Sequence, residues 1–461
     1  FDEATTSCQR ALALKPKDAA IYLNLARLAH RRGEIEEAEQ YSRHALESEP
    51  DNAAAHSAWL FCLSHQDTLS PEALYAEHLK FGERFEAPLK PLWQAPPNDK
   101  SPERTLRVGL VSGDLLNHVA AAYIQPMLAS LSHRPGIELH IYDNQVARYS
   151  AHSLHTRFPH WHVIAGLPDD VLARRIRNDA IDILVDLSGH TPNNRLTCFA
   201  HRPAPIQASW IGYPGTTGLT GMDYFLADPF FLPPGECDHL FTEKIIYLPS
   251  TLPCLMDEQA PPVLPLPALI HGHLTFGSFN RPNKIHPRVV ALWSALLRAL
   301  PDSRMVLAAM TDEATQKRLL SWFVREGIAP KRLTLLQRTS KTEYLAQHHL
   351  IDICLDTFPY NGSATAGDAL WMGVPTLTLA GKGIPGRAGA AWQRHLGLAA
   401  FVADTPEAFV NIGRDWSNRL DELSGIRNNL RDNIRHHKTS RADNLAVWLD
   451  RALRTAWKTW C

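Results

Sequence analysis

The start of the chain resembles itself after a shift of 34 residues. Small residues in such a pattern allow two antiparallel helices to approach closely, and proline suits the first turn of a helix but breaks its interior. The period therefore predicts helical hairpins that stack along the chain, while a single hairpin with chance spacing is the less favoured alternative. The matching pairs are Ala4 with Ala38, Ala11 with Ala45, Leu12 with Leu46, Pro16 with Pro50, and Asp18 with Asn52.

A period of 34 residues is that of the tetratricopeptide repeat. Fewer than three units are visible, and such arrays usually need three or more units to be stable. We therefore expect either further repeats or support from the rest of the chain. Stacked repeats present an extended groove, so the expected partner is a peptide or protein.

Composition excludes several classes of function. The 461 residues carry 47 Lys and Arg against 48 Asp and Glu, a balance that argues against a general nucleic-acid or anionic-membrane binder. No apolar run reaches about 18 residues and no signal peptide is visible, so we expect no membrane span. The seven cysteines form no CxxC pair, which fits a cytoplasmic location. The 23 histidines lack an HExxH motif, and no metal site is expected.

After the repeats the sequence alternates between strand and helix patterns. Short apolar runs such as Val108–Val111 and Ile183–Leu187 are separated by helical patterns, which predicts parallel sheets covered by helices, an α/β architecture. Two proline-rich stretches interrupt the pattern and mark boundaries. The predicted organisation is α-helical tetratricopeptide-like repeats over 1–86, a linker over 87–104, two Rossmann-like lobes over 105–260 and 261–404, and C-terminal helices over 405–461 that pack on the lobes.

Two segments of the second lobe compete as a phosphate site. Gly381, Gly383 and Gly386 form a GxGxxG pattern, but it follows one of the last strands, whereas a dinucleotide fingerprint belongs to the first βαβ unit. NAD or FAD binding is therefore disfavoured. Residues 356–368 run from a strand end to a helix start, and hydroxyl residues such as Ser363 and Thr365 leave backbone N–H groups facing outward toward an anion. An ordinary Ser/Thr N-cap explains this segment equally well.

Charged and titratable residues follow other strand ends. Lys284 and Lys341 are both predicted at the sheet edge where this helix begins, and two cations with a helix N-terminus suit a diphosphate without a metal. Asp368, one turn into the helix, can accept hydrogen bonds from a ribose diol. In the first lobe, His118 and His190 follow strand ends, and an imidazole can accept or orient a proton near neutral pH. The alternatives are solvated surface lysines and buried structural histidines.

Longer motifs carry a resemblance to a known family. The most specific motif is the block Arg202-Pro203-Ala204-Pro205-Ile206-Gln207, followed by Gly212-Tyr213-Pro214-Gly215-Thr216. Two further motifs are Cys354-Leu355-Asp356-Thr357 and the pattern of Asp114 with Asn117-His118. With the repeats, these motifs resemble the bacterial members of the O-GlcNAc transferase and SPINDLY family. The resemblance implies two lobes of the GT-B fold and an inverting transfer of N-acetylglucosamine from UDP-GlcNAc to Ser or Thr hydroxyls of proteins. It implies no metal and no cofactor besides this donor.

The resemblance also implies roles for single residues. His118 matches a cleft histidine that acts as base or positions the acceptor, Lys284 the lysine on the diphosphate, Lys341 and Asp368 the pair at the ribose, and Thr365 a threonine on the β-phosphate. Gly212, with Ile211, resembles the wall against the sugar.

Several donor-site positions depart from the pattern of the family's animal members. Ser363-Ala364 replaces a His-Thr pair and removes one phosphate hydroxyl. Arg281 replaces a glutamine and can supply phosphate affinity in its place. Tyr344 replaces a histidine, and Asn283 replaces a tyrosine before the lysine. These departures leave the nucleotide and the sugar open.

Three alternatives therefore remain from the sequence. The first is protein O-fucosyl transfer from GDP-fucose. The second is a non-catalytic repeat adaptor with a degenerate transferase lobe. The third is a transferase for small molecules or polysaccharides, which the repeats argue against.

Overall fold

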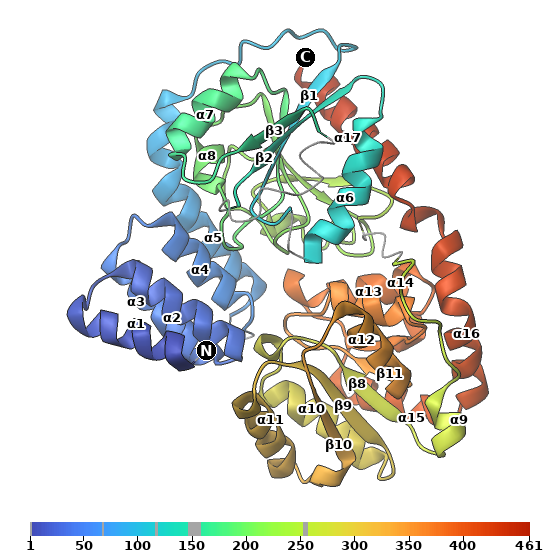
Figure 1. Ribbon diagram of the computed structural model, residues 1–461. Coiled ribbons are helices and arrows are strands. Elements are labelled where there is room, and N and C mark those ends of the chain that lie inside the picture. Colours follow the sequence, from blue (N-terminus) through green and yellow to red (C-terminus); the bar gives the residue numbers. More distant parts are fainter. Residues whose placement is uncertain (1, 67–68, 116–118, 146–157, 252–256) are drawn as a thin grey trace.

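The protein has three parts: a helical repeat region, a first α/β lobe and a second α/β lobe (Figure 1). The computed structural model describes residues 2–66, 69–115, 119–145, 158–251 and 257–461. In Figure 1 the repeats lie beside both lobes, and the C-terminal helices run along the opposite side. The architecture expected from the sequence, helical repeats followed by two Rossmann-like lobes and terminal helices, is confirmed.

Five helices form the repeat region. The predicted period is visible in their caps, because Asp18 accepts hydrogen bonds from the backbone N–H groups of Ala20 and Ile21, and Asn52, one period later, accepts one from Ala55. Such caps satisfy N–H groups that the first helical turn leaves unpaired. The helices are α1 (Asp2–Leu14), α2 (Ala19–Arg32), α3 (Ile35–Ser48), α4 (Ala53–Leu63) and α5 (Pro71–Phe85).

The short repeat array is supported by the rest of the chain. Glu86, buried at the end of α5, accepts hydrogen bonds from the backbone N–H groups of Thr220 and Gly221 in the first lobe. On the other side, Arg318 of the second lobe pairs with Glu34 at 3.2 Å. The repeats therefore contact both lobes.

The first lobe contains a seven-stranded parallel sheet with the order β3-β2-β1-β4-β5-β6-β7. Two of these strands, β3 and β6, are not among the strands expected from the sequence. The strands are β1 (Leu106–Ser112), β2 (Ile137–Asp143), β3 (His160–Val163), β4 (Ile183–Asp186), β5 (Ile206–Ser209), β6 (Tyr224–Ala227) and β7 (Lys244–Tyr247), with helices α6 (Val119–Ser132), α7 (Asp169–Asn178) and α8 (Leu196–Ala200).

The second lobe contains a six-stranded parallel sheet with the order β10-β9-β8-β11-β12-β13. A core of apolar side chains from the sheet and its helices, Trp293 and Phe276 among them, holds it together. The strands are β8 (Thr275–Ser278), β9 (Arg304–Met310), β10 (Leu333–Gln337), β11 (Ile353–Leu355), β12 (Thr376–Leu379) and β13 (Val402–Ala403). The helices are α9 (Pro267–His271), α10 (Pro287–Ala299), α11 (Glu313–Arg325), α12 (Lys341–Ala346), α13 (Ala364–Trp371) and α14 (Ala388–His395).

The C-terminal helices divide between the lobes. Helices α15 (Pro406–Trp416) and α16 (Leu420–His436) pack on the second lobe, while α17 (Ala442–Trp460) returns to the first lobe (Figure 1). Leu449, Leu453 and Trp457 of α17 belong to the apolar core of the first sheet. No helix among the described residues is long and apolar enough to cross a membrane.

Candidate active site between the lobes

Lys284 lies at the centre of the polar groups that follow the strands of the second lobe. Its ammonium Nζ donates a hydrogen bond to the carbonyl oxygen of Asn361 at 2.7 Å and lies 4.6 Å from the ring centroid of Tyr360. Burial lowers the pKa of Lys284 to about 8, with Asp356 acting in the opposite direction and Arg281 in the same one. The lysine is therefore a partly desolvated cation, which interacts strongly with an anion.

Asp356, at the end of β11, holds the loop that shapes this site. Its carboxylate accepts hydrogen bonds from the backbone N–H groups of Thr357 and Gly362, at 2.9 and 2.7 Å, and from the hydroxyl of Thr378 at 3.0 Å. Burial raises the pKa of Asp356 to about 6. A side chain on Gly362 would meet Thr365 Oγ1 at 2.3 Å, so the loop can approach helix α13 only with glycine at this position.

Helix α13 begins at this loop with an open N-terminus. Ser363 occupies the N-cap position, its side chain is exposed, and it makes no capping hydrogen bond to the first turn. Thr365 donates a hydrogen bond to the amide oxygen of Asn280, the residue that leads from β8 toward Lys284. This links the start of α13 to the Lys284 segment. A helix N-terminus of this kind attracts anions.

An ionic pair lies about one helical turn further along α13. Lys341 Nζ is 2.7 Å from Asp368 Oδ1, and it also lies 5.2 Å from the ring centroid of Tyr344. Burial raises the pKa of Asp368, while Lys341 and a hydrogen bond from Tyr344 counteract the rise. The predicted ribose pair is thus assembled, and Tyr344 is part of it.

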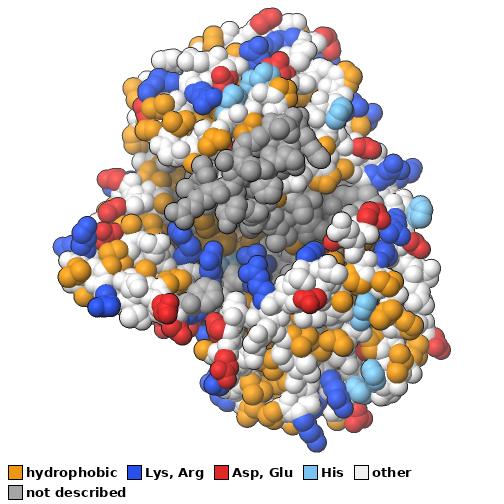
Figure 2. All heavy atoms as spheres, in the orientation of Figure 1, with side chains coloured by type: hydrophobic (Ala, Val, Ile, Leu, Met, Phe, Trp, Pro, Cys, Tyr) orange, Lys and Arg blue, Asp and Glu red, His pale blue; other side chains and the backbone are white. Residues whose placement is uncertain are grey.

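Arg281 is exposed beside this group, and basic side chains gather where the repeats and the two lobes meet (Figure 2). The structure therefore brings Arg281, Lys284, Ser363 and Thr365 to one loop cluster and places the Lys341–Asp368 pair on the next turn of α13. These positions agree with the sequence expectation of a diphosphate and ribose site, and the roles themselves stay predictions.

The structure describes only one of the two histidines predicted as proton-handling residues in the first lobe. His118 lies outside the described residues. His190 is buried, and both of its ring nitrogens are occupied, by the Ser57 hydroxyl and by the carbonyl oxygen of Thr217, each at 3.0 Å. Burial holds the pKa of His190 well below its ordinary value. This geometry joins the repeats to the first lobe and gives no support to a catalytic role.

Gly212 lies where the loop after β5 passes the loop after β4. A Cβ atom at this position would meet the carbonyl oxygen of Leu187 at 2.2 Å and Ser188 Cα at 2.6 Å. Ile211, the residue before it, adopts a left-handed conformation with φ of 65°. Such strain in a non-glycine residue is typical of functional sites. The close contacts that a Cβ atom would make mean that only glycine can occupy position 212 in this packing.

Several residues of the cluster were not expected from the sequence. His65, just after α4, stacks on Tyr360, and the half-buried His30 of α2 packs against His65 with ring centroids 4.7 Å apart. Burial, with smaller contributions from Arg281 and Lys284, lowers the pKa of His30 to about 4. No local pattern announces these contacts, since they join segments that are distant along the chain.

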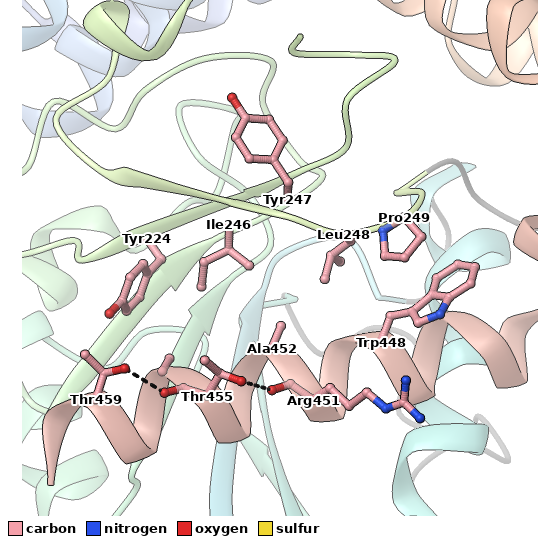
Figure 3. Close-up of a pocket in the computed structure, with 11 residues that line it drawn as sticks. Tyr224, Ile246, Tyr247, Leu248, Pro249, Trp448, Arg451, Ala452, Thr455 and Thr459 are labelled. Carbon is pink, nitrogen blue, oxygen red and sulfur yellow. Dashed lines mark hydrogen bonds between the residues drawn. The ribbon is translucent and has the colours of Figure 1, made fainter. Parts of the chain in front are cut away.

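A separate pocket of about 470 Å³ lies in the first lobe, between β7 of the sheet and helix α17 (Figure 3). It is lined by Tyr224 and Ile246 from the strands and by Trp448 and Arg451 from the helix. None of the residues that the sequence predicts for the donor site lies in its lining.

Two parallel-sheet lobes with this donor-side cluster, preceded by helical repeats, define a GT-B architecture of the repeat-bearing type. The model of glycosyl transferase family 41 matches residues 38–259 and 265–442, and a tetratricopeptide repeat model matches residues 1–58. The chain therefore belongs to glycosyl transferase family 41, as the sequence resemblance predicted.

Named relatives agree with this assignment. The chain is 34% identical over 433 residues to a probable UDP-N-acetylglucosamine–peptide N-acetylglucosaminyltransferase SPINDLY of Oryza sativa, covering 90% of this chain and 46% of the relative. A UDP-N-acetylglucosamine–peptide N-acetylglucosaminyltransferase of Caenorhabditis elegans is 24% identical over 441 residues, covering 70% of this chain and 38% of that protein. The chain thus spans about half the length, or less, of the curated relatives it matches.

A solved structure is similar over nearly the whole chain. The structure of a mutant O-GlcNAc transferase of Thermobaculum terrenum superimposes with a TM-score of 0.92 at 35% identity, covering 99% of this chain and 88% of that one. The order of repeats, lobes and terminal helices is therefore that of this O-GlcNAc transferase.

Proposed function

We propose that the protein transfers N-acetylglucosamine from UDP-GlcNAc to Ser or Thr hydroxyls of protein acceptors with inversion at the sugar carbon. The observation that carries the proposal is Lys284, a partly desolvated cation that donates a hydrogen bond to Asn361, in the loop that leads to the open N-terminus of α13. The family membership and the names of the relatives support the same reaction.

The chemistry follows from where negative charge develops. When the bond between the sugar and the diphosphate breaks, charge grows on the β-phosphate, and Lys284 with the N–H groups at the start of α13 would stabilise it there. Groups that are already oriented toward the developing charge lower the barrier because they need no reorganisation. Lys341 and Asp368 would hold the ribose, and Arg281 would add attraction for the phosphates.

The acceptor would enter from the side of the repeats. Helices α2 and α4 reach the donor cluster through His30 and His65, so a peptide bound along the repeats would be led toward Lys284. The proton of the acceptor hydroxyl needs a base, and His118 remains the sequence-based candidate.

The test is a transfer assay with radiolabelled donors on an acceptor peptide library. Wild-type protein should transfer sugar from UDP-GlcNAc, and Lys284→Ala should lose about 10²–10³-fold in kcat, the range for removing one group that stabilises a developing anion. Arg325→Ala, on the exposed face of α11, is the matched control and should retain activity. Transfer from GDP-fucose alone would assign the fucosyl reaction instead, and nucleotide binding without any transfer would make the protein an adaptor.

A further inference from the structure

Three histidines and a glutamate share one face of the sheet edge in the first lobe, away from the donor cluster. Strands β2 and β3 pair in parallel with His140 opposite His160 and Tyr142 opposite His162. Because side chains alternate along a strand, Glu138 and His140 of β2 lie on the same face as His160 and His162 of β3. A His-x-His pair on one strand and a third histidine on its neighbour therefore converge.

We propose that Glu138, His140 and His160 bind a divalent transition metal ion of the zinc class. The three donor atoms lie within 4.8 Å of one another, with His140 Nε2 at 2.9 Å and His160 Nε2 at 3.7 Å from Glu138 Oε1. Tetrahedral zinc with bonds of about 2.0–2.1 Å keeps its ligand atoms about 3.3 Å apart. The two measured distances lie on either side of this value.

Modest side-chain movement completes the site. The rings of His140 and His160 are stacked, with centroids 4.3 Å apart and planes 7° from parallel. The terminal torsion of histidine is soft, so both rings can turn their Nε2 atoms toward a common point beside Glu138. A solvent molecule would fill the fourth position, because His160 and Glu138 are 42% and 34% exposed.

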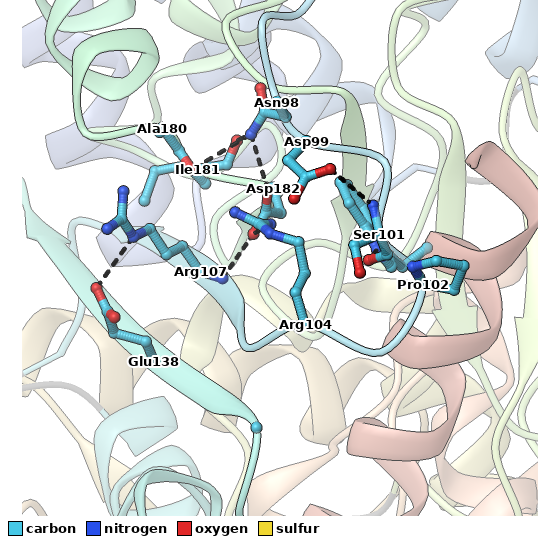
Figure 4. Close-up of polar contacts among 12 residues, drawn as sticks. Asn98, Asp99, Ser101, Pro102, Arg104, Arg107, Glu138, Ala180, Ile181 and Asp182 are labelled. Carbon is cyan, nitrogen blue, oxygen red and sulfur yellow. Dashed lines mark hydrogen bonds and ion pairs between the residues drawn. The ribbon is translucent and has the colours of Figure 1, made fainter.

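Two arginines set the affinity. Arg107 Nε lies 3.3 Å from Glu138 Oε1 and competes for this carboxylate. Figure 4 draws the two side chains facing each other. Arg175 of α7 donates a hydrogen bond to His162 Nδ1 at 2.7 Å, which leaves the hydrogen of His162 on Nε2, facing His140 Nδ1 at 3.5 Å. When a metal binds His140 Nε2, the hydrogen of His140 sits on Nδ1 and is donated in a hydrogen bond to His162 Nε2. His162 then carries its own hydrogen on Nδ1, so that atom can no longer accept the hydrogen bond from Arg175. Removing Arg175 should therefore tighten binding.

Zinc binding to the full chain is measured by competition with a chromophoric chelator, and Co²⁺ substitution reports the coordination by its visible absorption. We expect one site per chain with a tetrahedral Co²⁺ spectrum. His160→Gln and Glu138→Gln, both at partly exposed positions, should weaken binding at least about 100-fold, and Arg175→Ala should strengthen it several-fold. His133→Ala, an exposed histidine on the same lobe, is the control and should bind as the wild type does.

Thermal unfolding gives a second readout. Zinc should raise the unfolding temperature of the wild type and of His133→Ala but not that of His160→Gln, since a ligand stabilises only the state that binds it. Equal zinc affinity in the wild type and in His160→Gln, or no site tighter than millimolar, would overturn the proposal. Because the readouts are binding and stability, this result is independent of the transfer reaction.

Discussion

The imidazole of His65 lies flat on the ring of Tyr360, with ring centroids 4.0 Å apart and planes 12° from parallel. The ammonium of Lys284 contacts the same tyrosine ring. The repeat region thus reaches the donor lysine through one aromatic side chain. Burial keeps the pKa of His65 well below its ordinary value, so the ring is neutral and adds no repulsion to the cation.

Removing this stack should weaken turnover without unfolding the protein. An aromatic pair contributes about 0.5–1.5 kcal/mol beyond burial, so we expect His65→Ala to lower kcat/KM for the donor by about 2- to 10-fold. His65→Phe keeps a ring on Tyr360 and should restore most of the loss. His44→Ala, an exposed histidine on α3, should have no effect in the same steady-state assay. Identical kinetics for His65→Ala and wild type would separate the repeats from the donor site.

The pH dependence should report the charge of Lys284. The protonated lysine is the form that attracts the diphosphate, and its pKa is lowered to about 8, so kcat/KM should fall as pH rises through about 8. Arg281 lowers this pKa, so Arg281→Gln should move the basic limb to higher pH. Arg325→Gln provides the comparison and should leave the limb in place. A limb that stays where it is in Arg281→Gln would contradict the assignment to Lys284.

The Lys341–Asp368 pair should act as a unit on the nucleotide. Hydrogen bonds to charged groups contribute about 1.5–3 kcal/mol, so Lys341→Ala and Asp368→Ala should each raise the Kd for UDP by about 10-fold or more in calorimetry. Since both act on one ribose, the double variant should lose less than the product of the single losses. Lys331→Ala, at an exposed position before β10, should bind UDP normally. Fully multiplicative losses would show that the two residues act at separate places.

Arg427 should be a stability residue. This fully buried side chain of α16 donates hydrogen bonds to the carbonyl oxygens of Leu264, Ile351 and His348, at 2.7, 2.9 and 3.3 Å. Arg427→Ala would remove the donor to the carbonyl oxygens of Leu264 and Ile351, at a cost of about 1–3 kcal/mol each, while His348 keeps a backbone hydrogen bond from Ile351. The variant should therefore lower the free energy of unfolding by roughly 2–6 kcal/mol. Arg414→Ala on the exposed side of α15 should change it by less than about 0.5 kcal/mol. Denaturant unfolding followed by circular dichroism measures both.

The sequence predicts the parts of this fold that depend on local periodicity. The 34-residue repeat placed Asp18 and Asn52 at equivalent positions, and both are N-caps in the structure. Strand β3 was missed because its sequence, His160-Trp161-His162-Val163, has polar side chains on one face and is only partly buried. The terminal helix α17 was expected to pack on the lobes, but its periodicity does not say which one.

In the candidate site, too, the features that depend on local sequence pattern were predicted and the contacts between distant segments were not. Lys284, Ser363, Thr365 and Asp368 were predicted because parallel strands end at one edge of a sheet, and the structure places them there. The stacking of His65 on Tyr360 was not predicted, because a contact between the repeats and a lobe leaves no trace in either segment alone. The sequence predicts no metal site, because the convergence of the histidines of β2 and β3 depends on a strand pairing that no motif encodes.

The return of α17 to the first lobe has a consequence for biosynthesis. The core around β1 lacks Leu449, Leu453 and Trp457 until α17, which follows both lobes in the sequence, has been translated. The second lobe can close its own core earlier, although its strands are translated later than those of the first. The lobe that is made first is therefore finished last, and a chain cut before Ala442 would expose apolar surface on a lobe far from the cut.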